Sequence, residues 1–249
     1  MTNIHPEWQP LLSKAIAMLD KNYWQALQAD DGWLPGMSQI FNAFQQPLSK
    51  TRYILLGESP YPRAQSANGF AFWDAAVGEL WSLVGLSKPV NRATSFRNLI
   101  KMLLHARGDL QAPFTQEAIT ALDKSAYVKT AEQFFTGMMQ HGFMLLNATL
   151  VFKAGRVNAD AKAWRPFMAA LFEGLIEIKP EIKFVLLGKI AQQLCLSDNN
   201  IGLSAMHPYN IDFIEDQAVL DFFRPFDLLA PYCHNDVDNV EAHILLAPA

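Results

Sequence analysis

The sequence predicts an α/β protein with three layers, α/β/α, around a central, mostly parallel four-stranded sheet. Two observations predict this fold class. Short apolar runs that end at polar or glycine residues recur along the chain, and patterns of helical periodicity lie between them. Strands that alternate with helices form parallel sheets covered on both faces. The composition agrees, because 51% of the 249 residues are hydrophobic and only 18% are charged, which is enough to bury a sizeable core.

Four segments carry the strand pattern. Each is a short apolar run bounded by residues that favour turns, as expected of a strand buried on both faces. The fourth is the shortest and weakest. In chain order they are Arg52–Gly57, Gly142–Asn147, Ile182–Gly188 and Gly202–His207.

Helical patterns flank these strands. The first, Glu7–Leu27, has apolar residues near helical spacing and predicts one amphipathic helix. The segment Asp30–Pro47 contains several Gly and Pro residues and predicts irregular structure. The remaining predicted helices are Ser95–Ala106, Thr130–Gln140, Trp164–Glu177 and Ile190–Leu196.

Polar residues stand where the predicted strands end. They are Gly57-Glu58-Ser59, Asn147, Gly188-Lys189 and His207. Ligands of open α/β sheets bind at the carboxyl ends of the strands. The sequence therefore predicts that these residues share one site.

Charge and cysteine content exclude several classes of protein. The formal net charge is −4, so binding to nucleic acid requires a local basic patch. Cys195 and Cys233 are too few for a four-cysteine metal or iron–sulfur site and indicate thiols in a reducing compartment. No apolar run approaches a membrane span, and the N-terminal sequence does not fit a signal peptide. We expect a cytoplasmic protein.

The order of several short motifs resembles the uracil-DNA glycosylase superfamily, and most closely its family 1. That family has a G-Q-D-P-Y-H strand end, a Gly-Phe stacking segment, a P-S-L-x-N-x-x-K segment, an L-L-L-N strand end, a G-S-Y-A-Q turn and an H-P-S-P-L-S loop. The similar stretches here, in the same order, are Gly57–Pro62, Ala67–Phe72, Thr94–Lys101, Leu145–Asn147, Gly188–Gln192 and His207–Asp212. The resemblance covers roughly residues 51–226.

The resemblance implies one glycosylase-like domain over residues 1–249. Within it we expect an N-terminal helical segment at 1–50, a core at 51–230 and a C-terminal tail at 231–249. It also implies a monomer that acts on uracil-containing DNA without a metal or other cofactor. The tail contains Cys233, His234 and His243, but their spacing fits no zinc pattern.

The resemblance assigns a base pocket to four residues. Phe72 supplies an aromatic wall on which a flipped base stacks. Asn147 carries both an amide donor and a carbonyl acceptor, which suits uracil O4 and N3–H and leaves cytosine mispaired. Tyr61 occupies the position that excludes the thymine methyl group. His207 is expected to donate a hydrogen bond to O2 of the leaving base, where negative charge develops.

Three departures concern the chemistry. Ser59 stands where the family has its catalytic aspartate, and an uncharged hydroxyl cannot stabilise a sugar cation. Glu58 stands in place of the usual glutamine and is one candidate for the missing carboxylate. Asp74, beyond the stacking segment, is the other candidate. Pro62 replaces the histidine that ends the first motif.

The DNA-binding parts are also altered. Ser95 is kept, while Lys189 stands at the serine position of the G-S-Y-A-Q turn and Ile211, still apolar, stands at the wedge leucine position; all three are expected DNA contacts. Tyr209 and Asp212 replace two phosphate-binding serines. Possible compensating cations are Arg63, Lys88, Arg92, Arg97, Lys153, Arg156 and Lys189.

Three functions remain open at this stage. The first is hydrolysis of the N-glycosidic bond of uracil, or of a related base, in DNA. The second is a catalytically inactive protein that binds uracil or DNA. The third is an N-glycosidase for free nucleosides or nucleotides. For the first we expect weak activity that favours single-stranded DNA, because flipping a base from a duplex costs a few kcal/mol.

Overall fold

The computed structural model describes residues 4–188 and 197–232. Two compact units, interleaved in sequence, make up the chain. The first unit takes in Met1–Ala76, Gly142–Leu186 and Ile190–Gly202, and the second takes in Val77–His141, Leu187–Lys189 and Leu203–Ala249.

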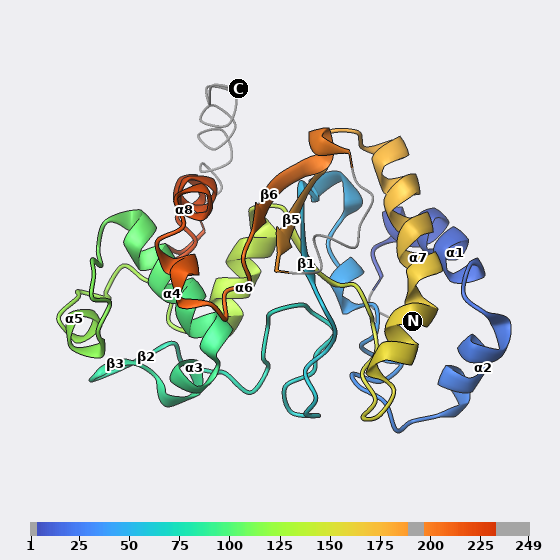
Figure 1. The fold of residues 1–249 in the computed structure, drawn as a ribbon, viewed down its shortest axis with the longest axis horizontal. Coiled ribbons are helices and arrows are strands. Elements are labelled where there is room, and N and C mark those ends of the chain that lie inside the picture. Colours follow the sequence, from blue (N-terminus) through green and yellow to red (C-terminus); the bar gives the residue numbers. More distant parts are fainter. Residues whose placement is uncertain (1–3, 189–196, 233–249) are drawn as a thin grey trace. The chain divides into compact units, whose positions relative to one another are not determined.

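The fold is a three-layer α/β/α arrangement around a four-stranded sheet (Figure 1). The strands are β1 (Tyr53–Gly57), β4 (Phe143–Asn147), β5 (Lys183–Leu187) and β6 (Ile201–Ala205), in the order β4-β1-β5-β6. The central strand β1 is parallel to both β4 and β5. All four predicted strands are confirmed within a residue or two at each end.

Complete burial explains why these strands read as continuous apolar runs. Every residue of β1 and of β4 is buried, as is most of β5. A strand covered on both faces has no solvent side, so it does not alternate polar with apolar residues. The stacked rings of Tyr53 and Phe143, 4.8 Å apart, extend the β1–β4 pairing at its amino end.

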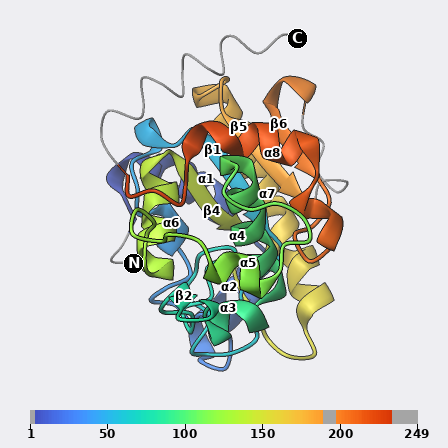
Figure 2. The same ribbon diagram turned by 90° about the vertical axis from the view of Figure 1, so that its left-hand side faces the viewer.

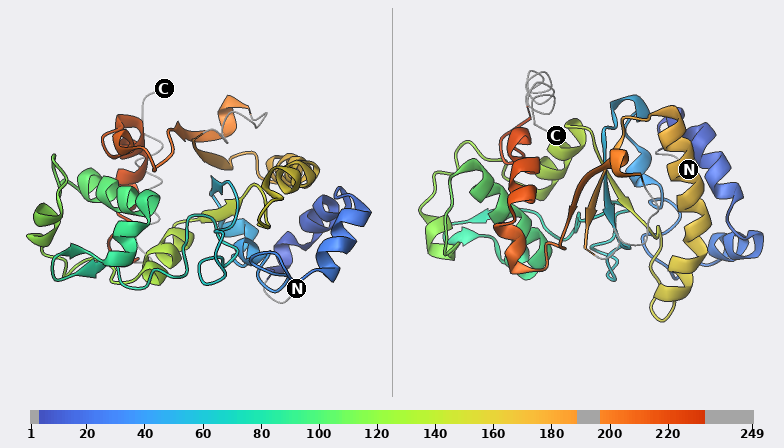
Figure 3. Two further views of the ribbon diagram at one scale, coloured as in Figure 1. Left: turned by 60° about the horizontal axis from the view of Figure 1, so that its bottom comes forward. Right: turned by 45° about the horizontal axis from the view of Figure 1, so that its top comes forward.

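The helices of the first unit are short except for one. They are α1 (Gln9–Ala17), α2 (Lys21–Ala29) and the long α7 (Val157–Ile178), with single 3₁₀ turns at Pro6–Trp8, Asn42–Phe44, Leu48–Lys50 and Asp198–Asn200. Helix α1 packs on α7, as the right-hand view of Figure 3 shows. The approach is close, because a Cβ on Gly174 would lie 2.5 Å from Leu11.

The prediction of one helix over Glu7–Leu27 is wrong. The structure has a 3₁₀ turn and two helices there, with a break at Met18–Asp20. The reason is Asp20, whose carboxylate accepts a hydrogen bond from the backbone N–H of Tyr23 at 2.9 Å and caps a new helix. The helix predicted at Trp164–Glu177 is confirmed, and it begins earlier, at Val157.

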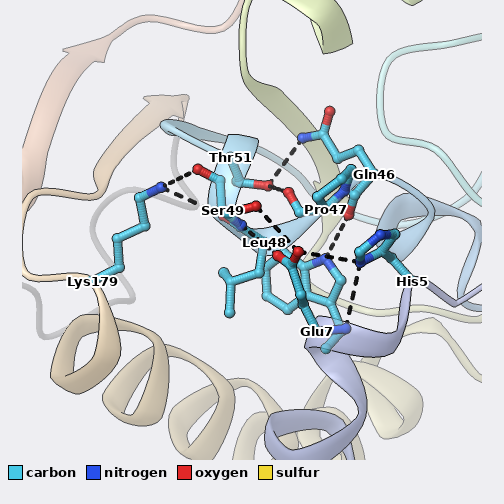
Figure 4. A network of polar contacts seen from close by, with 9 residues as sticks. His5, Glu7, Gln46, Pro47, Leu48, Ser49, Thr51 and Lys179 are labelled. Carbon is cyan, nitrogen blue, oxygen red and sulfur yellow. Dashed lines mark hydrogen bonds and ion pairs between the residues drawn. The ribbon is translucent and has the colours of Figure 1, made fainter.

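A polar network ties the N-terminal turn to the segment before β1 (Figure 4). The Glu7 carboxylate accepts hydrogen bonds from the backbone N–H of Ser49 at 2.7 Å and from its hydroxyl at 3.2 Å. The bond from the Ser49 N–H lowers the pKa of Glu7. From the other side, Lys179 donates to the Ser49 carbonyl at 2.9 Å. These contacts fix where the chain enters the sheet.

The second unit is mainly helical. Its elements are the hairpin strands β2 (Trp81–Ser82) and β3 (Gly85–Leu86), the helices α3 (Lys88–Arg92), α4 (Thr94–Arg107), α5 (Gln116–Thr120), α6 (Ala131–Gln140) and α8 (Gln217–Phe223), and 3₁₀ turns at Ile211–Ile214 and Arg224–Phe226. Helix α8 packs against α4 (Figure 2).

The predicted helices Ser95–Ala106 and Thr130–Gln140 are confirmed. The first is ended by Gly108 with a φ of 86°, and the second begins with a capping box between Thr130 and Gln133. The helix predicted at Ile190–Leu196 lies outside the described residues. Across residues 4–188 and 197–232, no helix has the length and hydropathy needed to span a membrane.

Candidate active site

The carboxyl ends of β1 and β4 bring two predicted site segments side by side within the first unit. Gly57 pairs with Asn147 in the parallel register. The pairing continues past the strands, because Ala148 N–H donates to the Gly57 carbonyl at 2.9 Å and Thr149 N–H donates to the Glu58 carbonyl at 3.0 Å. The residues that follow the two strands therefore lie at one edge of the sheet, as the sequence predicted.

Asn147 is the most informative residue of this edge. Its side chain is only 2% exposed, yet its amide has no hydrogen-bond partner among the described residues. The amide makes no hydrogen bond to the protein, but it is not fully sealed from solvent, since Ser66 Oγ is the one fully buried side-chain polar atom without a partner among the described residues. A bound ligand that supplies both a donor and an acceptor would satisfy this amide.

Gly57 makes room for that side chain. A Cβ at position 57 would lie 2.7 Å from Asn147 Oδ1 and 2.8 Å from the Cβ of Ala71. The glycine of the first motif is therefore required by the close approach of two neighbours, and not by its own backbone conformation. In the sequence, this glycine marks a strand end and opens the first motif, but the close approach that requires it is not visible there.

The segment that carries Phe72 is fastened to β4. Ala71 N–H donates to the Leu145 carbonyl at 3.0 Å. Phe72 follows with a φ of 63°, which is unusual for a residue other than glycine, and its ring is only partly buried. Backbone strain of this kind costs of order 1–3 kcal/mol and clusters at functional sites. The strain here holds an aromatic side chain at the strand-end edge of the sheet.

Tyr61 supports the same segment. Its hydroxyl donates to the Phe72 carbonyl at 3.2 Å. Burial, followed by the nearby Asp74 carboxylate, raises the pKa of Tyr61 to about 12. Tyr61 is therefore a neutral hydrogen-bond donor at physiological pH, and it holds the backbone that positions Phe72.

Asp74 is fully engaged in the loop. One carboxylate oxygen pairs with Arg63 at 2.9 Å, and the other accepts the backbone N–H of Ala76 at 2.9 Å. The side chain is buried. These contacts close the segment from Arg63 to Ala76, so Asp74 is a structural residue and not the free carboxylate that its sequence position allowed.

Glu58 and Ser59 lie directly after β1. Glu58 is exposed and Ser59 is partly buried. Within the part of the chain that the structure describes, no side chain or backbone group bonds the Glu58 carboxylate. Of the two candidate carboxylates, Glu58 is thus the one that is available to a ligand or a water molecule.

The second unit contains His207, just beyond the end of β6. Its Nδ1 accepts a hydrogen bond from the backbone N–H of Tyr209 at 3.1 Å. An N–H group can only donate, so this contact places the proton of the neutral imidazole on Nε2. Gly188 permits the arrangement, because a Cβ there would lie 2.9 Å from the Cβ of His207.

The loop after His207 is held by α4. The side chain of Asn98, which is buried, donates to the Pro208 carbonyl at 2.8 Å. The loop ends in a 3₁₀ turn capped by the Asn210 side chain, which accepts the Asp212 N–H at 3.2 Å. Ile211 then stands 59% exposed. Asn98 was missed as a site residue, although it lies in the Thr94–Lys101 motif.

The predicted DNA contacts differ in their surroundings. Ser95 lies in the first turn of α4 and is partly buried. Lys189 lies outside the described residues. Three of the other candidate cations form ion pairs, namely Arg63 with Asp74, Lys153 with Asp30 and Arg156 with Asp160. Lys88 and Arg92 have no carboxylate partner in residues 4–188 and 197–232.

No metal centre is present among the described residues, since no group of three or more His, Cys, Asp or Glu side chains converges there. The predicted tail residues Cys233, His234 and His243 lie outside the described part. Within the first unit, a partly buried aromatic ring and a buried amide without a partner are groups that suit a planar base with donors and acceptors on its edge. The fold and these groups suit an α/β protein that binds a planar base.

The chain belongs to the uracil DNA glycosylase superfamily, whose family model matches residues 45–231. It is similar to the crystal structure of the wild-type UNG from Nitratifractor salsuginis, with 37% identity, 92% of this chain and 94% of that chain covered, and a TM-score of 0.87. Curated relatives named uracil-DNA glycosylase include one from Acinetobacter baumannii, which is 29% identical over 80% of this chain and 73% of the relative. Another, from a Nocardioides species, is 26% identical over 76% of this chain and 71% of the relative.

Proposed function

We propose that this protein hydrolyses the N-glycosidic bond between uracil, or a related base, and deoxyribose in DNA, the first step of base-excision repair. One observation carries the proposal: the Asn147 side chain is only 2% exposed and its amide lacks a hydrogen-bond partner among the described residues, at the strand end where the motif resemblance places the base pocket. The similarity to proteins named uracil-DNA glycosylase supports it.

Base recognition follows from the chemistry of three side chains. Asn147 donates to uracil O4 and accepts from N3–H, a pattern that cytosine reverses. With cytosine bound, donors and acceptors in the pocket would stay unpaired, and each unpaired group costs about 1–3 kcal/mol. Phe72 provides the stacking surface. Tyr61 holds the Phe72 backbone and excludes the thymine methyl group.

Cleavage breaks the bond between the sugar C1′ and the base nitrogen N1. The bonding electrons leave with the base, and the negative charge spreads to O2, where His207 donates from Nε2–H. One such preorganised donor is commonly worth about 3–4 kcal/mol. The oxygen of a water molecule then forms a bond to C1′. The proton that this water loses passes to a general base of the protein.

Glu58 is the proposed base and the anion that stabilises the sugar cation. Its availability among the described residues and the engagement of Asp74 by Arg63 and Ala76 support this choice. The Ser59 hydroxyl can orient the water but carries no charge. A displaced carboxylate predicts slow chemistry, because loss of a well-positioned base commonly removes about 10²–10⁴ in rate.

The proposed substrate is DNA, and single-stranded DNA above all. Ser95 and Lys189 are proposed phosphate contacts, and the exposed Ile211 fills the space that a flipped base leaves. A cytoplasmic location and a monomeric state remain predictions from the sequence.

Ser59 specifically favours a second candidate function. Without the aspartate at this position, the protein would bind uracil in DNA and not release it. Both functions include binding to uracil-containing DNA, but only the glycosylase releases free uracil. A measurement of released uracil therefore distinguishes them.

The deciding experiment incubates the protein with oligonucleotides that contain one uracil, cytosine or thymine, both single-stranded and duplex. Free base is measured by chromatography and abasic sites by alkaline cleavage. We expect uracil release, faster from the single strand, and a loss of about 5- to 150-fold in kcat/KM for Asn147→Ala, the equivalent of about 1–3 kcal/mol. Binding of uracil-DNA without release would establish the second function, and neither binding nor release would refute both.

A further inference from the structure

The β2–β3 hairpin of the second unit ends in two exposed apolar side chains. Trp81 pairs with Leu86 and Ser82 with Gly85, which leaves Leu83 and Val84 at the tip. Leu83 is 98% exposed and Val84 is 67% exposed. Two-residue hairpin turns favour Gly, Asn and Asp, so the turn itself does not call for Leu and Val. These two side chains need another explanation.

The hairpin is rigidly supported, although it is short. Gln116 of α5 donates to the Leu86 carbonyl at 2.9 Å, and the Trp81 indole donates to the Val128 carbonyl at 2.7 Å. The Ser82 hydroxyl accepts the Val84 N–H at 3.3 Å within the turn. Gly85, with a φ of 108°, admits the Gln116 side chain, which a Cβ would approach to 2.9 Å. The tip is therefore held in place before any partner arrives.

The segment from the hairpin through α4 is rich in cations, although Glu79 precedes it and Glu117 lies in α5, the helix that packs on β3. The 29 residues from Leu80 to Gly108 contain Lys88, Arg92, Arg97, Lys101 and Arg107 and no Asp or Glu, in a chain whose net charge is −4. Helix α3 follows the hairpin directly and lies beside it (Figure 1, Figure 2). Its Lys88 and Arg92 are exposed or partly exposed and have no carboxylate partner in the described part of the chain.

We propose that the 81–86 hairpin of the second unit is a second DNA-binding element, in which Leu83 and Val84 insert between bases of the duplex while Lys88 and Arg92 contact phosphates next to the insertion. Apolar side chains on a basic support are the combination by which proteins unstack and bend duplex DNA. A local surplus of positive charge on an acidic chain selects a polyanion as the occupant. The inference rests on the proposed function only in taking uracil-DNA as the substrate.

The hairpin also offsets what the loop at 207–212 lacks. Tyr209 and Asp212 stand there in place of phosphate-binding serines, and Glu215 and Asp216 follow. Those carboxylates repel phosphates, so Ile211 alone is a poorly supported wedge. The apolar tip at Leu83 and Val84, followed by Lys88 and Arg92, would supply contacts to duplex DNA that the 207–212 loop lacks.

The test compares the double variant Leu83→Ser/Val84→Ser with wild type on a fluorescent duplex of about 20 base pairs and on a single strand of about 12 nucleotides, each with one uracil. The matched control is Ile178→Ser, which alters a 60% exposed apolar residue of the first unit. We expect the double variant to lose about tenfold in duplex affinity and duplex cleavage, with little change on the single strand, and the control to lose nothing. The variant Lys88→Ala/Arg92→Ala should lower the slope of log Kd against log salt by about 2.

Unchanged duplex binding in both double variants would overturn the proposal and assign the tip to a different partner. A wild-type protein that binds the duplex but releases no uracil would refute the glycosylase function, while the affinity measurements would still decide the role of the hairpin. A wild-type protein that does not bind the duplex at all would refute the hairpin proposal as well.

Discussion

Asn147 Oδ1 lies 2.7 Å from the point where a Cβ on Gly57 would stand. Only glycine at position 57 therefore leaves room for the Asn147 amide. The two residues pair across parallel strands β1 and β4. The pairing of β1 with β4 places the Asn147 amide at the edge of the sheet, next to Gly57. Because Gly57 has no side chain, the amide fits there. The candidate base pocket thus depends on backbone geometry as much as on its polar groups.

The substitution Gly57→Ala tests this dependence. The added methyl group would collide with Asn147 and Ala71, and overpacking of this kind costs about 1–3 kcal/mol. We expect a fall in melting temperature and at least about a tenfold loss of uracil release. Gly137→Ala is the matched control, because Gly137 lies in α6 and no described atom outside that helix comes within 4 Å of the point where its methyl group would stand. Full activity in Gly57→Ala would show that Asn147 is not placed by this contact.

Removal of the amide should lower stability much more at Asn98 than at Asn147. Asn98 is buried and donates to the Pro208 carbonyl, so Asn98→Ala leaves that carbonyl unpaired and should cost about 1–3 kcal/mol of unfolding free energy. Asn147→Ala removes an amide without a partner among the described residues and should change stability by less than about 1 kcal/mol. Urea unfolding measures both. Equal, large losses would mean that Asn147 is structural.

Tyr61 predicts a loss of stability in alkali. Its pKa is about 12 in the folded protein against 10.0 for the free side chain, mainly because it is buried. A raised folded-state pKa stabilises the fold below pH 10, and this contribution is lost as pH rises from 10 toward 12. Over that range wild type should lose about 2 kcal/mol relative to Tyr61→Phe, measured by urea unfolding. Parallel curves for the two proteins would contradict the burial of the hydroxyl.

Restoring the family aspartate should accelerate the reaction. Ser59→Asp returns a carboxylate to the position where the family has it, and a positioned base is commonly worth about 10²–10⁴ in rate. We expect single-turnover release from single-stranded DNA to rise by about 10² or more. Ser59→Asn, of the same shape without the charge, should not increase the rate. If Ser59→Asp left the rate unchanged, the side chain at position 59 would not lie close to the sugar cation.

Much of the fold was predictable because buried parallel strands leave a plain signal. The runs at 53–57, 143–147 and 183–187 are apolar through most of their length and end at turn residues, so periodicity and length identify them. The break at Asp20 was not predictable from apolar spacing, since the pattern of Glu7–Leu27 continues through it. The hairpin at 81–86 has strands of two residues, which are too short to show any period.

The sequence proposes residue types for the candidate site but not their contacts. The order of motifs proposes Asn147, Phe72 and His207 as site residues, and these assignments stay predictions. The burial of the Asn147 amide without a partner among the described residues, the positive φ of Phe72 and the bond that holds His207 Nδ1 depend on the folded backbone. The pairing of Arg63 with Asp74, which leaves Glu58 as the available carboxylate, has no sequence signature.

The proposed chemistry is tested most simply by the single-turnover rate of uracil release from single-stranded DNA by wild type, Glu58→Gln and His207→Ala. The proposed chemistry predicts measurable release by wild type, a loss of about 10²–10⁴ for Glu58→Gln and of about 10²–10³ for His207→Ala, with uracil-DNA affinity largely kept in Glu58→Gln. Release at the wild-type rate by both variants would contradict it.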